Sequence, residues 1–149
     1  MSDSKQYYLP KGLPIPVPEL DQLSRPYWEG LLQDRLMVQR CIQCKQWQFG
    51  PEWICYQCHS FDLDWQEVEP EGVIYSWERV WHPSHAALKS HGPYIAVLVD
   101  LPRVGNVRMV GNLLGDPHQE VEIGAAVIGV FEKHSHASPP YGLLHWQLK

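Results

Sequence analysis

The four cysteines are the clearest candidates for chemistry in this chain. Cys41 and Cys44 form one C-x2-C pair, Cys55 and Cys58 form another, and ten residues separate the pairs. Two residues between thiolates let each tight knuckle present both sulfur atoms to one ion, and the intervening loop completes a tetrahedral site. Zinc suits four soft thiolates, although a rubredoxin-like iron would accept the same spacing. We therefore expect one structural zinc ion at these four positions.

A tetrathiolate zinc ion has no open coordination position, so it holds a fold and does not activate water. Metal binding then supplies folding free energy that a ribbon of about thirty residues cannot obtain from a core of its own. With all four cysteines used as ligands, no thiol remains to act as a nucleophile. The G-x-S-x-G, G-x-G-x-x-G, Walker and H-E-x-x-H patterns are also absent. We predict a chain that is not catalytic on its own.

Charged and aromatic side chains suggest a second, ligand-binding site. A phosphorylated ligand needs only two or three converging cations, because charge-assisted contacts do not require a basic protein. In an OB barrel, loop residues that follow a strand can line a binding face. The candidate ligand-binding residues are Arg40, Lys45, Arg79, Trp81, His82 and Arg108.

Two histidine pairs are weaker candidates for metal binding or acid/base chemistry. The pairs are His82 with His85 and His134 with His136, and both fall in expected loops without a carboxylate at a matching ligand spacing. We expect these four side chains to be exposed to solvent. A stand-alone enzyme that uses His82 or His85 as a base would lack a nucleophile and an orienting acid.

Length and charge limit the possible functions. The chain has 149 residues and a formal net charge of −5. This length fits one domain or two small modules and excludes a large multidomain enzyme. The acidic balance disfavours nucleic acid as a partner, because phosphate-backbone binding normally needs a broad cationic field. No apolar run approaches the roughly 18 residues of a membrane span, so we expect a cytoplasmic protein with no membrane contact.

The N-terminal part combines an arm, a helix and the metal module. Residues 1–22 contain four prolines, which favour an extended arm laid across a partner or across its own domain, or else a mobile tail. Ser24 offers a capping hydroxyl and Pro26 suits a first helical turn, so a short helix is expected within 23–35. The zinc ribbon follows at 36–68.

The remaining residues, 69–149, read as β structure. Five runs rich in β-branched and aromatic residues are separated by glycine and proline turns. The expected strands are 73–81, 94–101, 107–113, 121–132 and 143–148. Five antiparallel strands in about eighty residues commonly close into a small barrel, of which the OB-fold is the five-stranded version. The predicted fold class is therefore mainly β, with a small open sandwich as the alternative to the OB-fold barrel.

Aromatic residues lie on or beside the cysteine knuckles. They are Trp47, Phe49, Trp53 and Tyr56. Either they cover the metal and pack on the barrel, or they make the ribbon a recognition flap.

The order of these parts resembles a known family. Pro-Tyr-Trp-Glu at 26–29 precedes Arg-Cys-Ile-Gln-Cys at 40–44 and Cys-Tyr-Gln-Cys at 55–58; Gly-Val-Ile-Tyr-Ser-Trp at 72–77 and Ile-Gly at 123–124 follow. This order resembles the acyl-CoA-associated zinc-ribbon/OB-fold family. Its members accompany thiolases, hydroxymethylglutaryl-CoA synthases, and steroid side-chain aldolases and hydratases.

The resemblance covers residues 25–131 and implies a non-catalytic subunit bound to a thiolase-fold partner. In such a hetero-oligomer the ribbon and barrel help to close a coenzyme A site or acyl channel, and the catalytic residues belong to the partner. The four cysteines match the family's metal ligands by position. The arm and the aromatic residues look like those of small subunits of thiolases for aromatic CoA thioesters, such as benzoylsuccinyl-CoA thiolase. An accessory subunit of a steroid side-chain retro-aldolase or hydratase, and a nucleic-acid-binding OB module, are the alternatives.

Overall fold

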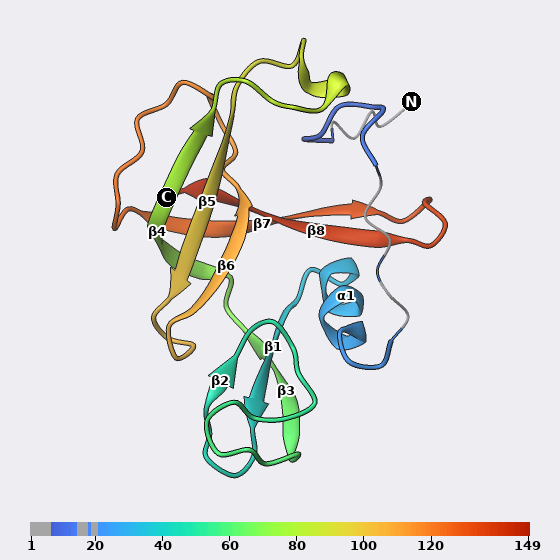
Figure 1. The fold of residues 1–149 in the computed structure, drawn as a ribbon, viewed down its shortest axis with the longest axis vertical. Helices are drawn as coiled ribbons and strands as arrows, with labels where there is room; N and C mark the ends of the chain where they lie inside the picture. The colour runs from blue at the N-terminus through green and yellow to red at the C-terminus, as the bar shows by residue number, and fades with distance from the viewer. Residues whose placement is uncertain (1–6, 15–17, 19–20) are drawn as a thin grey trace.

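The computed structural model describes residues 7–14, 18 and 21–149 (Figure 1). Part of the arm predicted at 1–22 lies outside the described residues. Its described portion contacts the barrel, because the backbone N–H of Tyr8 donates a hydrogen bond to Glu132 Oε2 at 2.8 Å. This contact agrees with an arm that lies across its own domain. Among the described residues, no helix is long and apolar enough to cross a membrane.

The helix α1 spans Arg25–Leu32, within the range expected from the sequence. The expected cap is different, since Ser24 makes no side-chain capping bond. Its hydroxyl instead donates to Asp21 Oδ1 at 2.8 Å. On the helix's inner face, Leu31 is buried against Gly142, where an added Cβ would lie 2.9 Å from the Leu31 carbonyl carbon. Only a glycine allows the two backbones to approach so closely.

The metal module is a three-stranded antiparallel ribbon. Its strands are β1 (Leu36–Cys41), β2 (Trp47–Gln48) and β3 (Leu63–Val68), in the order β2-β1-β3. The central strand β1 alternates between the module and the barrel core, and Leu36 and Val38 are fully buried there. The ribbon and barrel therefore share one hydrophobic cluster.

The barrel is a five-stranded antiparallel sheet in the order β6-β5-β4-β7-β8. Its strands are β4 (Glu71–Val80), β5 (Tyr94–Leu101), β6 (Val107–Asn112), β7 (Ala126–His134) and β8 (Tyr141–Leu148), and the short 3-10 helix η1 (Ala86–Leu88) lies between β4 and β5. Leu113 forms a β-bridge with Trp146, and the N–H of Leu114 donates to the Trp146 carbonyl at 2.7 Å. These contacts nearly close the sheet, and the predicted mainly β fold class with a zinc ribbon and a five-stranded barrel is confirmed.

Several strand boundaries differ from the sequence prediction, and the largest difference is at the start of β7. The strand expected at 121–132 begins only at Ala126, because Gly124 adopts a φ of +90° and turns the chain. The last strand begins at Tyr141 rather than at 143, since Tyr141 pairs with His134 and Gly142 packs on α1.

Candidate functional site

The four cysteine sulfur atoms converge at the end of the ribbon. All four lie within 4.8 Å of one another. The Sγ atoms of Cys41 and Cys58 are 3.6 Å apart, as are those of Cys44 and Cys55. A zinc ion with Zn–S bonds of about 2.3 Å requires sulfur atoms about 3.8 Å apart in a tetrahedron. The donor set and its dimensions therefore fit a structural tetrathiolate zinc ion.

The two knuckles are built in the same way. In each, the residue after the second cysteine has a left-handed backbone, with φ of 64° at Lys45 and 61° at His59. Their N–H groups donate to the Cys41 and Cys55 carbonyls and close the turns. The backbone N–H of Cys58 then points at the Cys55 sulfur and lowers the pKa of this thiol to about 7, which favours the thiolate that binds metal.

Two buried glutamines fix the second knuckle relative to the first. Gln48 Nε2 donates to Gln39 Oε1 at 2.7 Å. Gln39 in turn bonds both backbone groups of Glu52, and Gln48 bonds the Ile54 carbonyl and the Tyr56 N–H. Because buried amides are costly without partners, this network holds the loop before Cys55 in one conformation.

The ribbon aromatics divide into a pair that packs on the barrel and an exposed pair. Trp47 and Phe49 pack against the barrel core, and an added Cβ at Gly105 in the β5–β6 turn would lie 3.0 Å from the Trp47 ring. Trp53 and Tyr56 are instead 61% and 57% exposed. The first pair docks the ribbon on the barrel, and the second pair faces outward.

Of the candidate ligand-binding residues on the ribbon, the Arg40 side chain is engaged in local contacts and the Lys45 side chain is exposed. Arg40 Nε donates to the Lys45 carbonyl at 3.0 Å, and its guanidinium lies 4.6 Å from the centre of the Trp47 ring. Arg40 also bonds Gln66 Oε1 at 3.2 Å. Arg40 and Lys45 are therefore neighbours, but the Arg40 guanidinium already has three partners.

The candidates on the barrel lie in two separate places. Arg79 bonds the carbonyls of Pro117 and Gln119 and lies 5.6 Å from the ring centre of exposed Trp81, which His82 follows. Arg108 lies 3.7 Å from the Tyr75 ring.

These two arginines lie at opposite ends of the sheet. On β5, Arg79 is opposite Ile95 and Arg108 is opposite Asp100. Five residues of a strand span about 17 Å, so the structure does not bring Arg79 and Arg108 together. Whether these residues bind a ligand stays a prediction.

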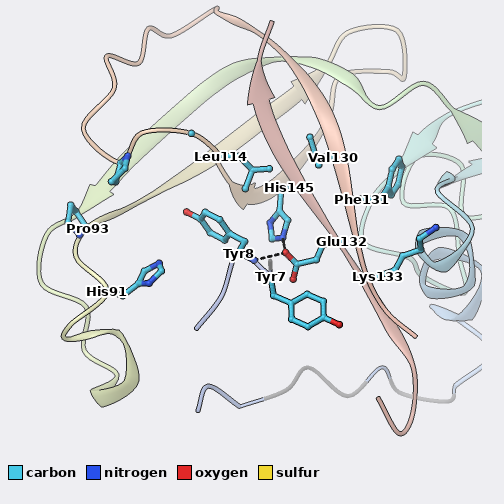
Figure 2. A pocket seen from close by; sticks show the side chains of 12 residues that line it. Tyr7, Tyr8, His91, Pro93, Leu114, Val130, Phe131, Glu132, Lys133 and His145 are labelled. Carbon is cyan, nitrogen blue, oxygen red and sulfur yellow. Dashed lines mark hydrogen bonds and ion pairs between the residues drawn. The ribbon is translucent and has the colours of Figure 1, made fainter. Parts of the chain in front are cut away.

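A second polar cluster lies where β7 and β8 meet the arm. Glu132 Oε1 is 2.7 Å from His134 Nε2. Glu132 Oε2 is 3.1 Å from His145 Nε2 (Figure 2). The His134 ring is stacked between Tyr7 and Tyr141, with centroids 4.0 and 4.4 Å away. Of the histidines expected to be exposed, His82, His85 and His136 are, but His134 is only partly so. The missed signal is the Glu-x-His spacing, which places both side chains on one face of a strand.

The cluster is held in a defined charge state. Burial would raise the pKa of Glu132, but the Tyr8 N–H and the two imidazoles outweigh it and lower this pKa. Burial lowers the pKa of His145, which is 2% exposed, and outweighs the nearby carboxylate. Among the residues that the structure describes, the buried His145 Nδ1 has no hydrogen-bond partner, so protonation would place an N–H there without an acceptor. Glu132 is thus ionised and His145 neutral at pH 7.

Comparison with known proteins agrees with this architecture. Residues 28–64 match the family model described as "ChsH2, rubredoxin-like zinc ribbon domain", and residues 65–132 match "ChsH2, C-terminal OB-fold domain". A solved structure described as "Ltp2-ChsH2(DUF35) aldolase" matches with 32% identity and a TM-score of 0.74, covering 89% of this chain and 98% of that one. The chain belongs to the ChsH2 family. The family resemblance seen in the sequence is confirmed.

Two further relatives extend the ChsH2 comparison. A probable enoyl-CoA hydratase alpha subunit of Thermomonospora curvata is 36% identical over 119 residues, which are 80% of this chain and 36% of the relative. The chain thus spans about a third of that protein's length. A DUF35 protein of unknown function from Sulfolobus solfataricus shares 17% identity with a TM-score of 0.55, covering 84% of each chain. This last likeness shows the fold alone.

The buried histidine of this ChsH2-type barrel predicts a pH dependence of stability. Since the pKa of His145 is lowered in the folded state, the unfolded chain takes up this proton first as the pH falls below about 6.5. Stability should therefore decrease from pH 7.5 to 5.5. His145→Gln, whose Nε2 can still donate to Glu132, should flatten this slope by up to one proton in urea unfolding at several pH values.

His118→Gln is the matched control, because His118 is exposed. It should keep the parental slope. Equal slopes for the parent and His145→Gln would contradict the assignment of a neutral buried imidazole.

Proposed function

We propose that this chain is a non-catalytic, zinc-binding OB-fold subunit of an acyl-CoA enzyme complex with a thiolase-fold catalytic partner. The observation that carries the proposal is the match along 98% of the ChsH2 chain in a solved aldolase whose description also names Ltp2. The use of all four cysteines as one metal cluster supports it, since no thiol is left for covalent catalysis. In this role the complex works in the cytoplasm.

The ribbon offers a surface for that partner. Five apolar side chains around the knuckles are exposed, and Phe61 is 76% exposed. We name this set the knuckle surface: Ile42, Trp53, Ile54, Tyr56 and Phe61. Interface cores favour aromatic residues, and a few of them usually supply most of the binding free energy. We assign the knuckle surface to contact with the catalytic subunit.

Co-purification tests this assignment. The tagged chain, coexpressed with its genomic neighbour of thiolase fold, should form a stable hetero-oligomer by size-exclusion chromatography and mass spectrometry. Trp53→Ala combined with Phe61→Ala should weaken the complex at least a hundredfold, because two interface aromatics are lost. Ile123→Ala removes a similarly exposed apolar side chain on the barrel and should change the affinity for the partner less than threefold. A monomeric chain, or equal losses in both variants, would contradict the proposal.

The complex would bind coenzyme A with help from this subunit. Arg40 and Lys45 on the ribbon, or Arg79 with Trp81 and His82 on the barrel, would meet the phosphates or the adenine ring. Because Arg79 and Arg108 lie about 17 Å apart along the sheet, they would contact different parts of the ligand. Calorimetry of the catalytic subunit with and without this chain tests the role, and unchanged CoA affinity and turnover would reject it.

Aromatic CoA thioesters such as benzoylsuccinyl-CoA are the substrate class that we favour for a thiolase partner. A hydratase partner is the second candidate, because the Thermomonospora curvata relative is described as a hydratase subunit. Incubating the complex with an enoyl-CoA and, separately, with a β-ketoacyl-CoA and free CoA distinguishes the two. If the complex hydrates the enoyl-CoA and does not cleave the β-ketoacyl-CoA, its catalytic partner is a hydratase and not a thiolase.

A further inference from the structure

A cleft of about 860 Å³ opens on the barrel, far in sequence from the cysteines. The arm, the η1–β5 connection, the β6–β7 loop and the strands β7 and β8 bound it. Figure 2 shows Tyr8 between Pro93 and His145, so the arm forms one wall and the barrel the other. This volume lies within the range of small-molecule sites, about 300–1,000 Å³. The knuckle surface and the candidate ligand-binding residues take no part in it.

The cleft is lined by both apolar and polar groups and disfavours anions. Leu114 and Val130 supply apolar side chains to its barrel wall, whereas the side chain of Phe131 points to the opposite face of β7 and packs on the barrel core. Glu132 is also a lining residue and is ionised, held by the Tyr8 N–H and two imidazoles. Lys133 also lines the cleft, but its ammonium group is 2.6 Å from Asp34 Oδ2 and so is already neutralised. An anionic ligand would therefore meet the negative charge of Glu132 and no unpaired lysine among the described lining residues.

Tyr8 supplies a polar contact suited to a neutral ligand. Burial, with a smaller contribution from Tyr94, raises the pKa of Tyr8, so its hydroxyl stays protonated and can donate a hydrogen bond. Tyr8 is fixed at two points. Its backbone N–H donates a hydrogen bond to Glu132, and its ring contacts the His145 ring, with 5.1 Å between the two centroids. A carbonyl oxygen of an uncharged ligand is an acceptor that suits such a donor.

We propose that this cleft binds an uncharged compound that has an apolar ring and a carbonyl oxygen. The ring lies against Leu114 and Val130, and the oxygen accepts a hydrogen bond from Tyr8. The ionised Glu132 positions the arm and excludes anions. This inference does not depend on the proposed function, since it concerns a cleft within one chain.

The test is a fluorescence titration of the full-length, zinc-loaded chain with the neutral naphthyl ketone Prodan. We expect binding with a stoichiometry of one and a blue shift of Prodan emission. The anionic naphthalene 8-anilinonaphthalene-1-sulfonate should bind at least tenfold more weakly. Binding of the anion as tightly as Prodan would overturn the ligand class.

Two variants locate the binding. Leu114→Trp fills the cleft and should weaken Prodan at least tenfold, whereas Val110→Trp, on a side chain that is 77% exposed, should change it less than twofold. Tyr8→Phe removes only the hydroxyl and should weaken Prodan about fivefold. Unchanged affinity in Leu114→Trp would overturn the site, and unchanged affinity in Tyr8→Phe would overturn the carbonyl contact. Circular dichroism and zinc content show whether each variant is folded. If Leu114→Trp does not fold, Tyr8→Phe alone tests the site.

Discussion

Replacing Cys55 with serine is expected to abolish zinc binding and unfold the ribbon. Cys55 is fully buried, and its sulfur lies within 4.8 Å of the other three. A serine hydroxyl is a poor zinc ligand at neutral pH because it stays protonated, and three thiolates without the fourth lose their tetrahedral cage. Structural zinc in small modules contributes about 10–16 kcal/mol of apparent binding free energy, more than the ribbon's few buried side chains can replace.

Elemental analysis by mass spectrometry is the direct measurement. The parent should contain one zinc ion per chain, and Cys55→Ser less than about a tenth of that. Gln57→Ser is the matched control, since Gln57 is exposed within the same knuckle and contributes only its backbone N–H. It should keep its zinc and its resistance to limited proteolysis. Full zinc content in Cys55→Ser would contradict the tetrathiolate site. Iron in the parent would show that the four cysteines hold a rubredoxin-like iron instead of zinc.

The metal site could be predicted from the sequence because its determinants are local. Each knuckle needs two cysteines three positions apart and a turn closed by the residue after the second cysteine. Lys45 and His59 close these turns by donating a backbone N–H to the carbonyl of the first cysteine. The five strands were also predictable, because alternation and turn residues are short-range signals. The late start of β7 follows from the local turn at Gly124, whereas the early start of β8 depends on a distant contact. Gly142 lets its strand begin early only because α1 packs on it.

The cleft could not be predicted for the same reason. Tyr8 and Glu132 are 124 residues apart in the chain, and nothing local to either residue indicates their hydrogen bond. The grouping of Glu132 with His145 likewise depends on the register of β7 against β8, in which Val130 is opposite His145. A polar segment such as His-Ser-His usually has solvent-exposed histidines, and the Glu-x-His spacing does not by itself indicate that His134 stacks between Tyr7 and Tyr141.

Replacing Trp146 with alanine is expected to produce the largest loss of stability in the barrel. Trp146 is 0% exposed and lies where β6 and β8, the two edge strands of the sheet, meet. It bridges Leu113, and the missing side chain of Gly111 leaves room for its indole ring, since an added Cβ would lie 2.8 Å from Trp146 Cδ1. Removing a buried tryptophan typically costs about 3–5 kcal/mol, partly because neighbours cannot collapse into the cavity. In a domain with a free energy of unfolding of about 5–15 kcal/mol, this is a large fraction.

Trp53→Ala makes the same chemical change on the knuckle surface, where the side chain is 61% exposed. Urea unfolding followed by circular dichroism should show a loss of about 3–5 kcal/mol for Trp146→Ala and less than about 1 kcal/mol for Trp53→Ala. Partner binding should show the reverse order for variants that remain folded, because Trp146 closes the barrel while Trp53 lies on the knuckle surface that we assign to the partner. Equal stability losses would mean that Trp53 packs within the fold, and the knuckle surface would then no longer be available to a partner.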